Sequence, residues 1–263
     1  MIHLEVWLST LVPILACMAA LWILSLLLKN TAIVDIFWGL GFVLIFWLTY
    51  ARSPLSQQPK TILLGLMVTI WGFRLAIHIL FRNIGKGEDA RYAQFRANNG
   101  VNWWWNSLFK VFVLQGLLIW IIAAPISIMQ VYPSAIGPLS LLGFGIWLLG
   151  FLFETIGDLQ LVRFKSDPTN KGQLLTSGLW ALTRHPNYFG DATQWWGFWI
   201  VSLTLDTWWT IFSPILITFL LLNFSGVPIT EKMLNNKNPD YHHYVKTVPK
   251  FIPNLINISR RHK

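Results

Sequence analysis

Long apolar runs separated by short polar connections dominate this chain. An α-helix needs about 20 predominantly apolar residues to cross a bilayer. Runs of that kind occur at residues 6–28, 33–50, 61–82, 108–130, 138–162, 189–205 and 208–226. None of them shows the ~10-residue alternation that is typical of the strands of a membrane barrel. The pattern therefore predicts an all-α fold, a polytopic transmembrane helical bundle of about seven spans.

Composition supports a membrane protein. Hydrophobic residues make up 54% of the 263 positions and charged residues only 12%, whereas soluble domains carry about 25% charged residues. The first 28 residues lack a basic start, and Lys29 follows the apolar run. We therefore expect a retained first span and not a cleaved signal peptide. Cys17 is the single cysteine, which excludes an intramolecular disulfide.

Basic residues predict an orientation. With the N-terminus outside, the seven-span topology places 17 of the 20 Lys and Arg residues on the cytoplasmic side and two outside, with Arg74 inside a span. Cytoplasmic connections carry such an excess of positive charge. The sequence therefore predicts an external N-terminus and a cytoplasmic C-terminus. The net charge of +9 follows mostly from this topology, so we expect the lipid bilayer as a partner and no nucleic acid.

Several ionisable residues lie within the apolar spans. Asp35 begins the second span, and Arg74 and His78 share one face of the third, four positions apart. Glu154 and Asp158 have the same spacing at the end of the fifth. A charged group inside a span costs about 2.5–3.5 kcal/mol on insertion scales, which makes each a candidate functional residue. Alternatives stay open: Asp35 as a helix cap, Arg74 as a partner of Glu154 or Asp158, and His78 as a packing residue.

The stretch "TRHPNYFGD", Thr183–Asp191, concentrates polar groups directly before the sixth span. Pro186 suits the first position of a helix because its missing N–H would have no partner there. A helix beginning near Asn187 would point its positive end toward Arg184 and His185, an arrangement that favours anions. From the residues alone two interpretations stay open: a binding site for phosphate or carboxylate, and a basic corner that fixes the chain at the membrane interface.

The C-terminal tail gathers further polar residues, including Glu231 and Tyr244. His242 and His243 are adjacent and so do not share a helix face. No third ligand stands at a useful spacing, and we expect no metal site.

Four stretches resemble the bacterial membrane family DUF1295. They are Phe153–Ile200 with the corner motif, "NTAIVDIFWGLGF", "WGFRLAIHILFRNIGKGEDARY" and the tail "SGVPITEKML…YHHYVKTVPKFIP". DUF1295 is in turn similar to steroid 5-alpha-reductases and sterol reductases. More distantly it is similar to isoprenylcysteine carboxyl methyltransferases, which share an Arg-His-Pro-x-Tyr-x-Gly corner, here Arg184 to Gly190.

The resemblance implies a steroid 5-alpha-reductase-like fold, treated as one membrane domain over 1–263 in the inner (plasma) membrane of a bacterium. Residues 1–136 would face the substrate, and 137–263 would bind NADPH from the cytoplasmic side. The implied activity is reduction of a C=C bond conjugated to a carbonyl in a hydrophobic, lipid-like substrate such as a steroid or isoprenoid. The implied cofactor residues are Glu154, Asp158, Lys165, Lys171, Arg184, His185, Asn187, Tyr188, Asp191, Glu231 and Tyr244.

The substrate side departs from the reductase pattern. The reductases have a Gln-Glu pair in the second helix and a Tyr in the third, whereas this chain has Asp35, and Trp71 or Arg74 aligns with the Tyr. Asp35, Arg74 and His78 are the catalytic candidates, the last two for polarising the carbonyl.

Two other functions stay open: a methyltransferase that uses S-adenosylmethionine, and a non-catalytic membrane protein or transporter. The set Glu154, Asp158 and Lys165 ahead of the corner favours the reductase over the methyltransferase. Transporters place polar groups near the bilayer midplane between matched repeats. Here the polar groups are expected on one side, which disfavours a transporter.

Overall fold

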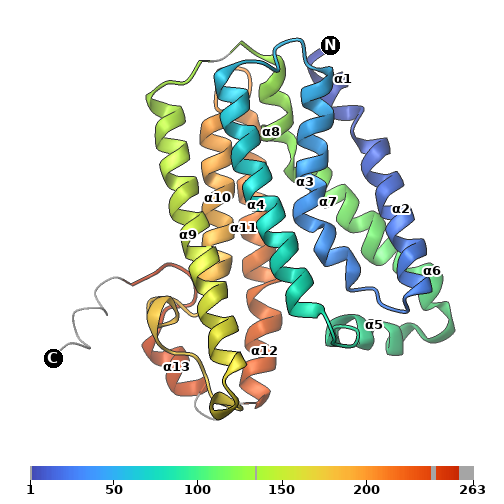
Figure 1. Cartoon of the computed structure of the whole chain (residues 1–263), viewed down its shortest axis with the longest axis vertical. Coiled ribbons are helices and arrows are strands. Elements are labelled where there is room, and N and C mark those ends of the chain that lie inside the picture. Colours follow the sequence, from blue (N-terminus) through green and yellow to red (C-terminus); the bar gives the residue numbers. More distant parts are fainter. Residues whose placement is uncertain (1, 134, 238–240, 255–263) are drawn as a thin grey trace. The chain divides into compact units, whose positions relative to one another are not determined.

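A computed structural model describes residues 2–133, 135–237 and 241–254 (Figure 1). Helices and their connecting turns make up these residues, and no strand occurs in the described ranges. The chain divides into two compact units, which are described separately: unit 1 is Met1–Gly137 with Ser202–Ser213, and unit 2 is Pro138–Val201 with Pro214–Lys263. The prediction of an all-α polytopic bundle is confirmed.

Unit 1 holds the first eight α-helices. They are α1 Ile2–Leu8, α2 Leu11–Leu27, α3 Ile33–Arg52, α4 Pro59–Asn83, α5 Ala90–Asn99, α6 Trp103–Ser107, α7 Leu114–Ile122 and α8 Ala124–Ile128. A π-helical segment, Leu108–Val113, joins α6 to α7. Unit 1 also contains the 3-10 turn Trp208–Ile211.

Close helix contacts hold unit 1 together. A Cβ atom on Gly39 of α3 would lie 2.6 Å from the carbonyl oxygen of Gly72 on α4, so both positions need glycine. Trp7 of α1 and Trp120 stack with ring centroids 4.2 Å apart. Each of these indoles donates a hydrogen bond to the backbone carbonyl of the other residue, at 3.1 and 3.2 Å. This reciprocal pair fastens the N-terminal helix to α7.

Unit 2 holds α9 Pro138–Ser166, α10 Pro186–Ser202, α11 Phe212–Asn223, α12 Val227–Lys237 and α13 Tyr241–Thr247, although the last residue of α10 and the first two of α11 are counted in unit 1. Glycines line the contact between α9 and α10. Gly143, Gly150 and Gly157 recur every seven residues on α9, and Gly190 and Gly197 have the same spacing on α10. At four of these five positions an added Cβ atom would lie only 2.5–2.7 Å from a heavy atom of the other helix: Gly143, Gly150, Gly190 and Gly197. The two backbones are therefore in direct contact.

Six helices in the described part of the chain are long and apolar enough to cross a membrane: Leu4–Leu27, Ile33–Arg52, Pro59–Asn83, Ala90–Ile122, Pro138–Ser166 and Trp208–Asn235. The predicted span 189–205 corresponds to α10, which has 17 residues and begins at Pro186. The predicted span 108–130 needs correction, because α7 ends at Ile122 and a separate helix, α8, follows. Pro125 explains the break, since proline lacks the N–H that would continue the helix.

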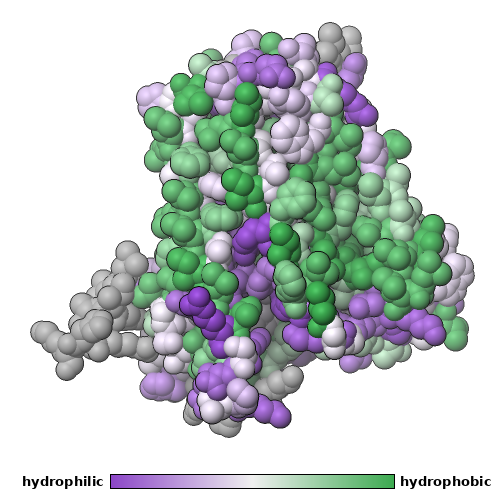
Figure 2. Space-filling view, in the orientation of Figure 1, coloured by the Kyte–Doolittle hydropathy of each residue, from purple (hydrophilic) through white to green (hydrophobic). Residues whose placement is uncertain are grey.

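Exposed side chains along the helices are strongly apolar. On α9 they include Leu141, Leu148, Leu152 and Leu159, each at least 39% exposed. Figure 2 shows apolar side chains along α9 and hydrophilic ones toward its C-terminal end. In a soluble protein such a surface would drive aggregation, whereas lipid solvates it. The protein is therefore an integral membrane protein.

Candidate functional site

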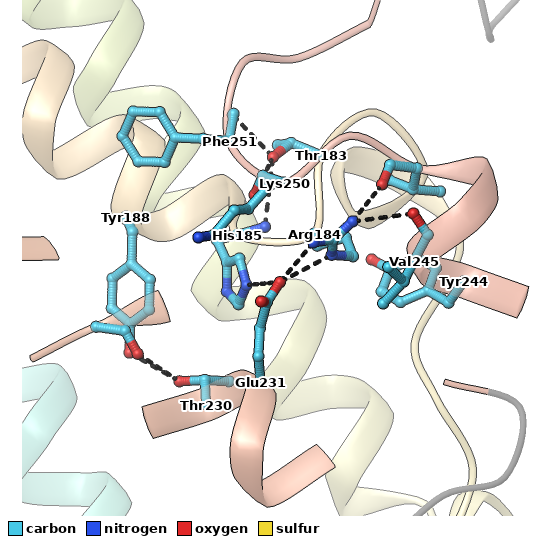
Figure 3. Close-up of polar contacts among 12 residues, drawn as sticks. Thr183, Arg184, His185, Tyr188, Thr230, Glu231, Tyr244, Val245, Lys250 and Phe251 are labelled. Atoms are coloured by element: carbon cyan, nitrogen blue, oxygen red, sulfur yellow. Dashed lines mark hydrogen bonds and ion pairs between the residues drawn. The ribbon is translucent and has the colours of Figure 1, made fainter. Parts of the chain in front are cut away.

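The corner stretch Thr183–Asp191 is fixed to the C-terminal tail by backbone hydrogen bonds. The N–H of Arg184 donates to the carbonyl of Pro249 at 3.0 Å, and the N–H of Asn254 donates to the carbonyl of Leu182 at 2.9 Å. The hydroxyl of Thr183 donates to the carbonyl of Phe251 at 2.8 Å (Figure 3). Residues near 183 and near 250, distant in sequence, therefore form one structure.

A second set of bonds holds the segment just before the corner to α9 and to α13. The indole N–H of Trp180 donates to the carbonyl of Gly157 at 3.0 Å, and the N–H of Leu179 donates to Oε1 of Gln160 at 3.0 Å. The hydroxyl of Tyr244 donates to the carbonyl of Trp180 at 2.5 Å. Tyr244, a predicted cofactor residue, is buried with Tyr241 and Val248. Its hydroxyl is thus bound to the segment just before the corner, and its role toward a cofactor stays a prediction.

Arg184 lies buried at the centre of this arrangement. Its Nε and Nη2 donate to Oε1 of Glu231 at 3.0 and 2.6 Å. Its Nη1 donates to the carbonyls of Val245 and Val248 at 3.2 and 2.8 Å. A guanidinium has five N–H donors, and these contacts use four of them. Arg184 therefore acts first as a clamp on α12 and the tail.

His185 is almost fully buried, with 1% of its side chain exposed. Its Nε2 lies 3.3 Å from Oε1 of Glu231, and its ring stacks on that of Tyr188 at a centroid distance of 5.6 Å. Figure 3 shows the imidazole between the Tyr188 ring and the Glu231 carboxylate. Burial lowers the pKa of His185 to about 4, and the positive charges of Arg184 and Lys250 act in the same direction while Glu231 opposes them. The imidazole is neutral at pH 7.

The lowered pKa of His185 predicts a loss of stability in acid. The unfolded chain protonates this imidazole below its ordinary pKa of about 6.5, and the folded chain only near 4. Between these values the unfolded state binds more protons, so the stability contributed by neutral His185 is complete above pH 6.5 and is lost as the pH falls toward 4. The full loss is about 3 kcal/mol.

His185→Gln is the matched variant, because glutamine stays neutral and can still donate to Glu231. The apparent unfolding temperatures of both proteins in detergent are measured from pH 8 to pH 4. We expect the wild type to lose stability relative to the variant across this window. A difference between the two proteins that does not change with pH would contradict the prediction.

The two carboxylates predicted on α9 both contact α10. Glu154 is 3% exposed, and its Oε2 accepts a hydrogen bond from the amide of Gln194 at 2.6 Å. Asp158 is 6% exposed, and its Oδ1 accepts from the amide of Asn187 at 3.2 Å. Gln194 was not predicted from the sequence. Its polar side chain inside an apolar span was the available signal.

The remaining predicted residues of unit 2 lie around this core. Lys165 and Lys171 are exposed at and after the end of α9. Tyr188 is half-buried, and its hydroxyl lies 3.2 Å from that of Thr230. Asp191 is half-buried on α10. Within the described ranges no group of three or more His, Cys, Asp or Glu side chains could hold a metal ion.

In unit 1, Asp35 belongs to a separate polar cluster. Its Oδ1 accepts from the hydroxyl of Tyr92 at 2.6 Å, and its Oδ2 accepts from Nη2 of Arg91 at 2.8 Å. Gln115 of α7 donates to the hydroxyl of Tyr92 at 3.1 Å. The N-cap of α3 is Ala32, and Asp35 lies in the first turn of that helix, where its carboxylate bonds Tyr92 and Arg91. Sequence reasoning missed Tyr92 and Gln115.

A second ion pair joins the loop before α5 to α5 itself and to the segment before α3. Arg96 donates to both carboxylate oxygens of Glu88 at 2.8 and 2.9 Å, and Glu88 also accepts from the N–H of Thr31. These hydrogen bonds offset the cost of burial and lower the pKa of Glu88. Arg74 and His78 are half-buried on α4, four residues apart. Their catalytic role stays a prediction.

Comparison with known proteins places the chain in a family. The sequence profile described as "Protein of unknown function (DUF1295)" matches residues 21–248. The chain belongs to the DUF1295 family. The match includes Asp35, the corner stretch and Glu231, so the predicted site residues lie inside the family region.

Two relatives of this DUF1295 protein are informative. An uncharacterized protein of Schizosaccharomyces pombe is 27% identical over 267 aligned positions, covering 89% of this chain and 76% of the relative. Its source shows that similar proteins are not confined to bacteria. "Probable O-methyltransferase ustE" of Ustilaginoidea virens is 32% identical over 84 positions, covering 32% of this chain and 28% of that protein.

Proposed function

We propose that this DUF1295 protein is an integral membrane reductase that uses NADPH to reduce a C=C bond conjugated to a carbonyl in a lipid-like substrate. The observation that carries the proposal is the pair of buried carboxylates on α9, each hydrogen-bonded to a side-chain amide of α10. Ionisable groups inside membrane spans are costly and mark functional sites.

The groups of unit 2 fit the chemistry of a dinucleotide. Asp158 and Asn187 provide a carboxylate and an amide, which suit ribose hydroxyls and a carboxamide. Lys165 and Lys171 are exposed cations for phosphates. When bound, NADPH would supply a hydride to one carbon of the C=C bond and become NADP⁺, and a proton, ultimately from water, would be added to the other carbon. The protein would position the cofactor and stabilise the negative charge that develops on the carbonyl oxygen. We assign carbonyl polarisation to Arg74 or His78 of unit 1, and Asp35 to the same substrate side. The proposed orientation puts the C-terminus in the cytoplasm.

The test is cofactor binding by the full chain in mild detergent, with NADPH, NADH and S-adenosylmethionine titrated separately. We expect NADPH to bind, and Asp158→Asn and Asn187→Ala each to weaken NADPH binding about tenfold or more, as for loss of a buried polar partner. Asp167→Asn is the matched control, because Asp167 is exposed in the same unit and asparagine retains its capping bond to Thr169. Unchanged affinity in both site variants would place the cofactor elsewhere.

A methyltransferase is the second candidate, favoured by the 84-residue similarity to the O-methyltransferase. Binding of S-adenosylmethionine without binding of NADPH would replace the first proposal by this one.

A further inference from the structure

The imidazole of His185 has one engaged and one unengaged nitrogen. Its Nε2 faces Oε1 of Glu231 at 3.3 Å, and the same oxygen accepts both bonds from Arg184. A carboxylate paired with a guanidinium accepts hydrogen bonds, so Nε2 carries the proton of the neutral ring. His185 is therefore the Nε2–H tautomer.

It follows that Nδ1 carries a lone pair and is an acceptor. This atom is buried and has no hydrogen-bond partner among the residues that the structure describes. Buried polar atoms without partners are rare in proteins and call for an explanation, such as a bound ligand or water. The backbone N–H of His185 donates to the hydroxyl of Thr183, and the Tyr188 ring stacks on one face of the imidazole. Neither contact uses Nδ1.

We propose that Nδ1 of His185 accepts a hydrogen bond from an N–H or O–H group of the cofactor, such as a ribose hydroxyl or the carboxamide N–H. This inference rests on the proposed function of unit 2 as the cofactor-binding part. It assigns a specific role to the corner stretch: an acceptor cannot bind an ionised phosphate, which offers only acceptors. Because the pKa of His185 is about 4, the imidazole is neutral at pH 7 and Nδ1 keeps its lone pair.

The assignment separates two tasks within unit 2. Four N–H donors of Arg184 are used in hydrogen bonds to Glu231 and to backbone carbonyls. His185 offers the lone pair of Nδ1 as an acceptor. Phosphate recognition then falls to the exposed lysines, Lys165 and Lys171, and the corner recognises an uncharged donor. Glu231 is a positioning residue, because it fixes the tautomer of His185.

Two substitutions of His185 separate the two ring nitrogens. The amide of asparagine takes the position of Nδ1 and can supply an acceptor there, whereas that of glutamine takes the position of Nε2 and can donate to Glu231. Binding of NADPH and of S-adenosylmethionine is titrated to wild type, His185→Asn and His185→Gln in detergent, with unfolding temperatures recorded for each. We expect His185→Gln to fold but to lose about tenfold or more in cofactor affinity, the effect of one lost hydrogen bond in a buried site. His185→Asn should keep affinity within about threefold while its unfolding temperature falls.

Nitrogen-15 spectra of histidine-labelled protein give a readout independent of activity. The resonances of His185 are assigned by their loss in His185→Asn. We expect Nδ1 to be unprotonated in the free protein and its resonance to shift on addition of cofactor. A protonated Nδ1, or equal cofactor affinity in His185→Gln and wild type, would overturn the inference.

The reductase proposal can fail separately. If S-adenosylmethionine binds and NADPH does not, the reductase proposal is wrong. The role of His185 is then tested by measuring the affinity of the same variants for S-adenosylmethionine. If neither cofactor binds, both proposals are overturned.

Discussion

Replacing Gly150 by leucine is expected to prevent unit 2 from folding. A Cβ atom at this position would lie 2.6 Å from the carbonyl oxygen of Gly190 and 2.7 Å from the backbone N of Gln194. Both atoms belong to the backbone of α10, which cannot rotate aside as a side chain can. The helices would have to separate, which would also break the bond between Gln194 and Glu154.

Gly145→Leu is the matched control on the same helix. Gly145 is exposed, and in the described part of the chain a Cβ atom there would have no contact within 4 Å beyond its own helix. Gly150→Ala gives a graded version, with an expected cost of about 1–3 kcal/mol for one overpacked methyl group. Size-exclusion profiles and thermal unfolding in detergent measure the outcome. Equal behaviour of the two leucine variants would show that α9 and α10 are not in close contact.

Replacing Arg184 by alanine is expected to release the C-terminal tail and lower stability by about 3–5 kcal/mol, the usual cost of removing one partner of a buried ion pair. The variant loses both bonds to Glu231 and both bonds to the carbonyls of Val245 and Val248. With those carbonyls unsatisfied, the segment around α13 should become accessible to protease.

Arg184→Lys and Arg163→Ala make this prediction specific. Lysine retains the positive charge but not the planar fork of the guanidinium. We therefore expect Arg184→Lys to keep the ion pair with Glu231, to lose the hydrogen bonds to the carbonyls, and to show intermediate protease resistance. Arg163 is an exposed arginine of α9, and its removal should change little. Limited proteolysis and unfolding temperature are the measurements. If the C-terminal tail is as resistant to protease in Arg184→Ala as in Arg163→Ala, Arg184 does not hold the tail in place.

The helices could be predicted from the sequence because lipid demands long apolar runs. Where local chemistry intervened, the prediction missed. Pro125 ended α7 before the predicted limit at residue 130, and the short polar α5 was not predicted as a helix at all. The seven-residue spacing of glycines on α9 and α10 was visible in the sequence and could have indicated the close packing of these two helices.

The candidate site was only partly predictable, because its partners are far apart in sequence. Arg184, His185 and Glu231 were all candidates, and the structure brings them together across 46 and 47 positions. The interpretation of Arg184 and His185 as a site for phosphate or carboxylate did not anticipate that Glu231 and backbone carbonyls would bind Arg184. Asp35 was a candidate too, but its contacts with Arg91 and Tyr92 span 56 and 57 positions. Hydropathy carries no information on such pairs.

The clamp on Arg184 also imposes an order on biosynthesis. The carbonyls that it binds belong to residues made 61 and 64 positions later. At synthesis rates of about 5–20 residues per second, these carbonyls are made roughly 3–13 s after Arg184. During that interval α10 has already been made while the corner before it lacks its tail partners. Unit 2 can therefore be completed only after Val245 and Val248 have emerged from the ribosome, whatever the speed at which its spans enter the membrane.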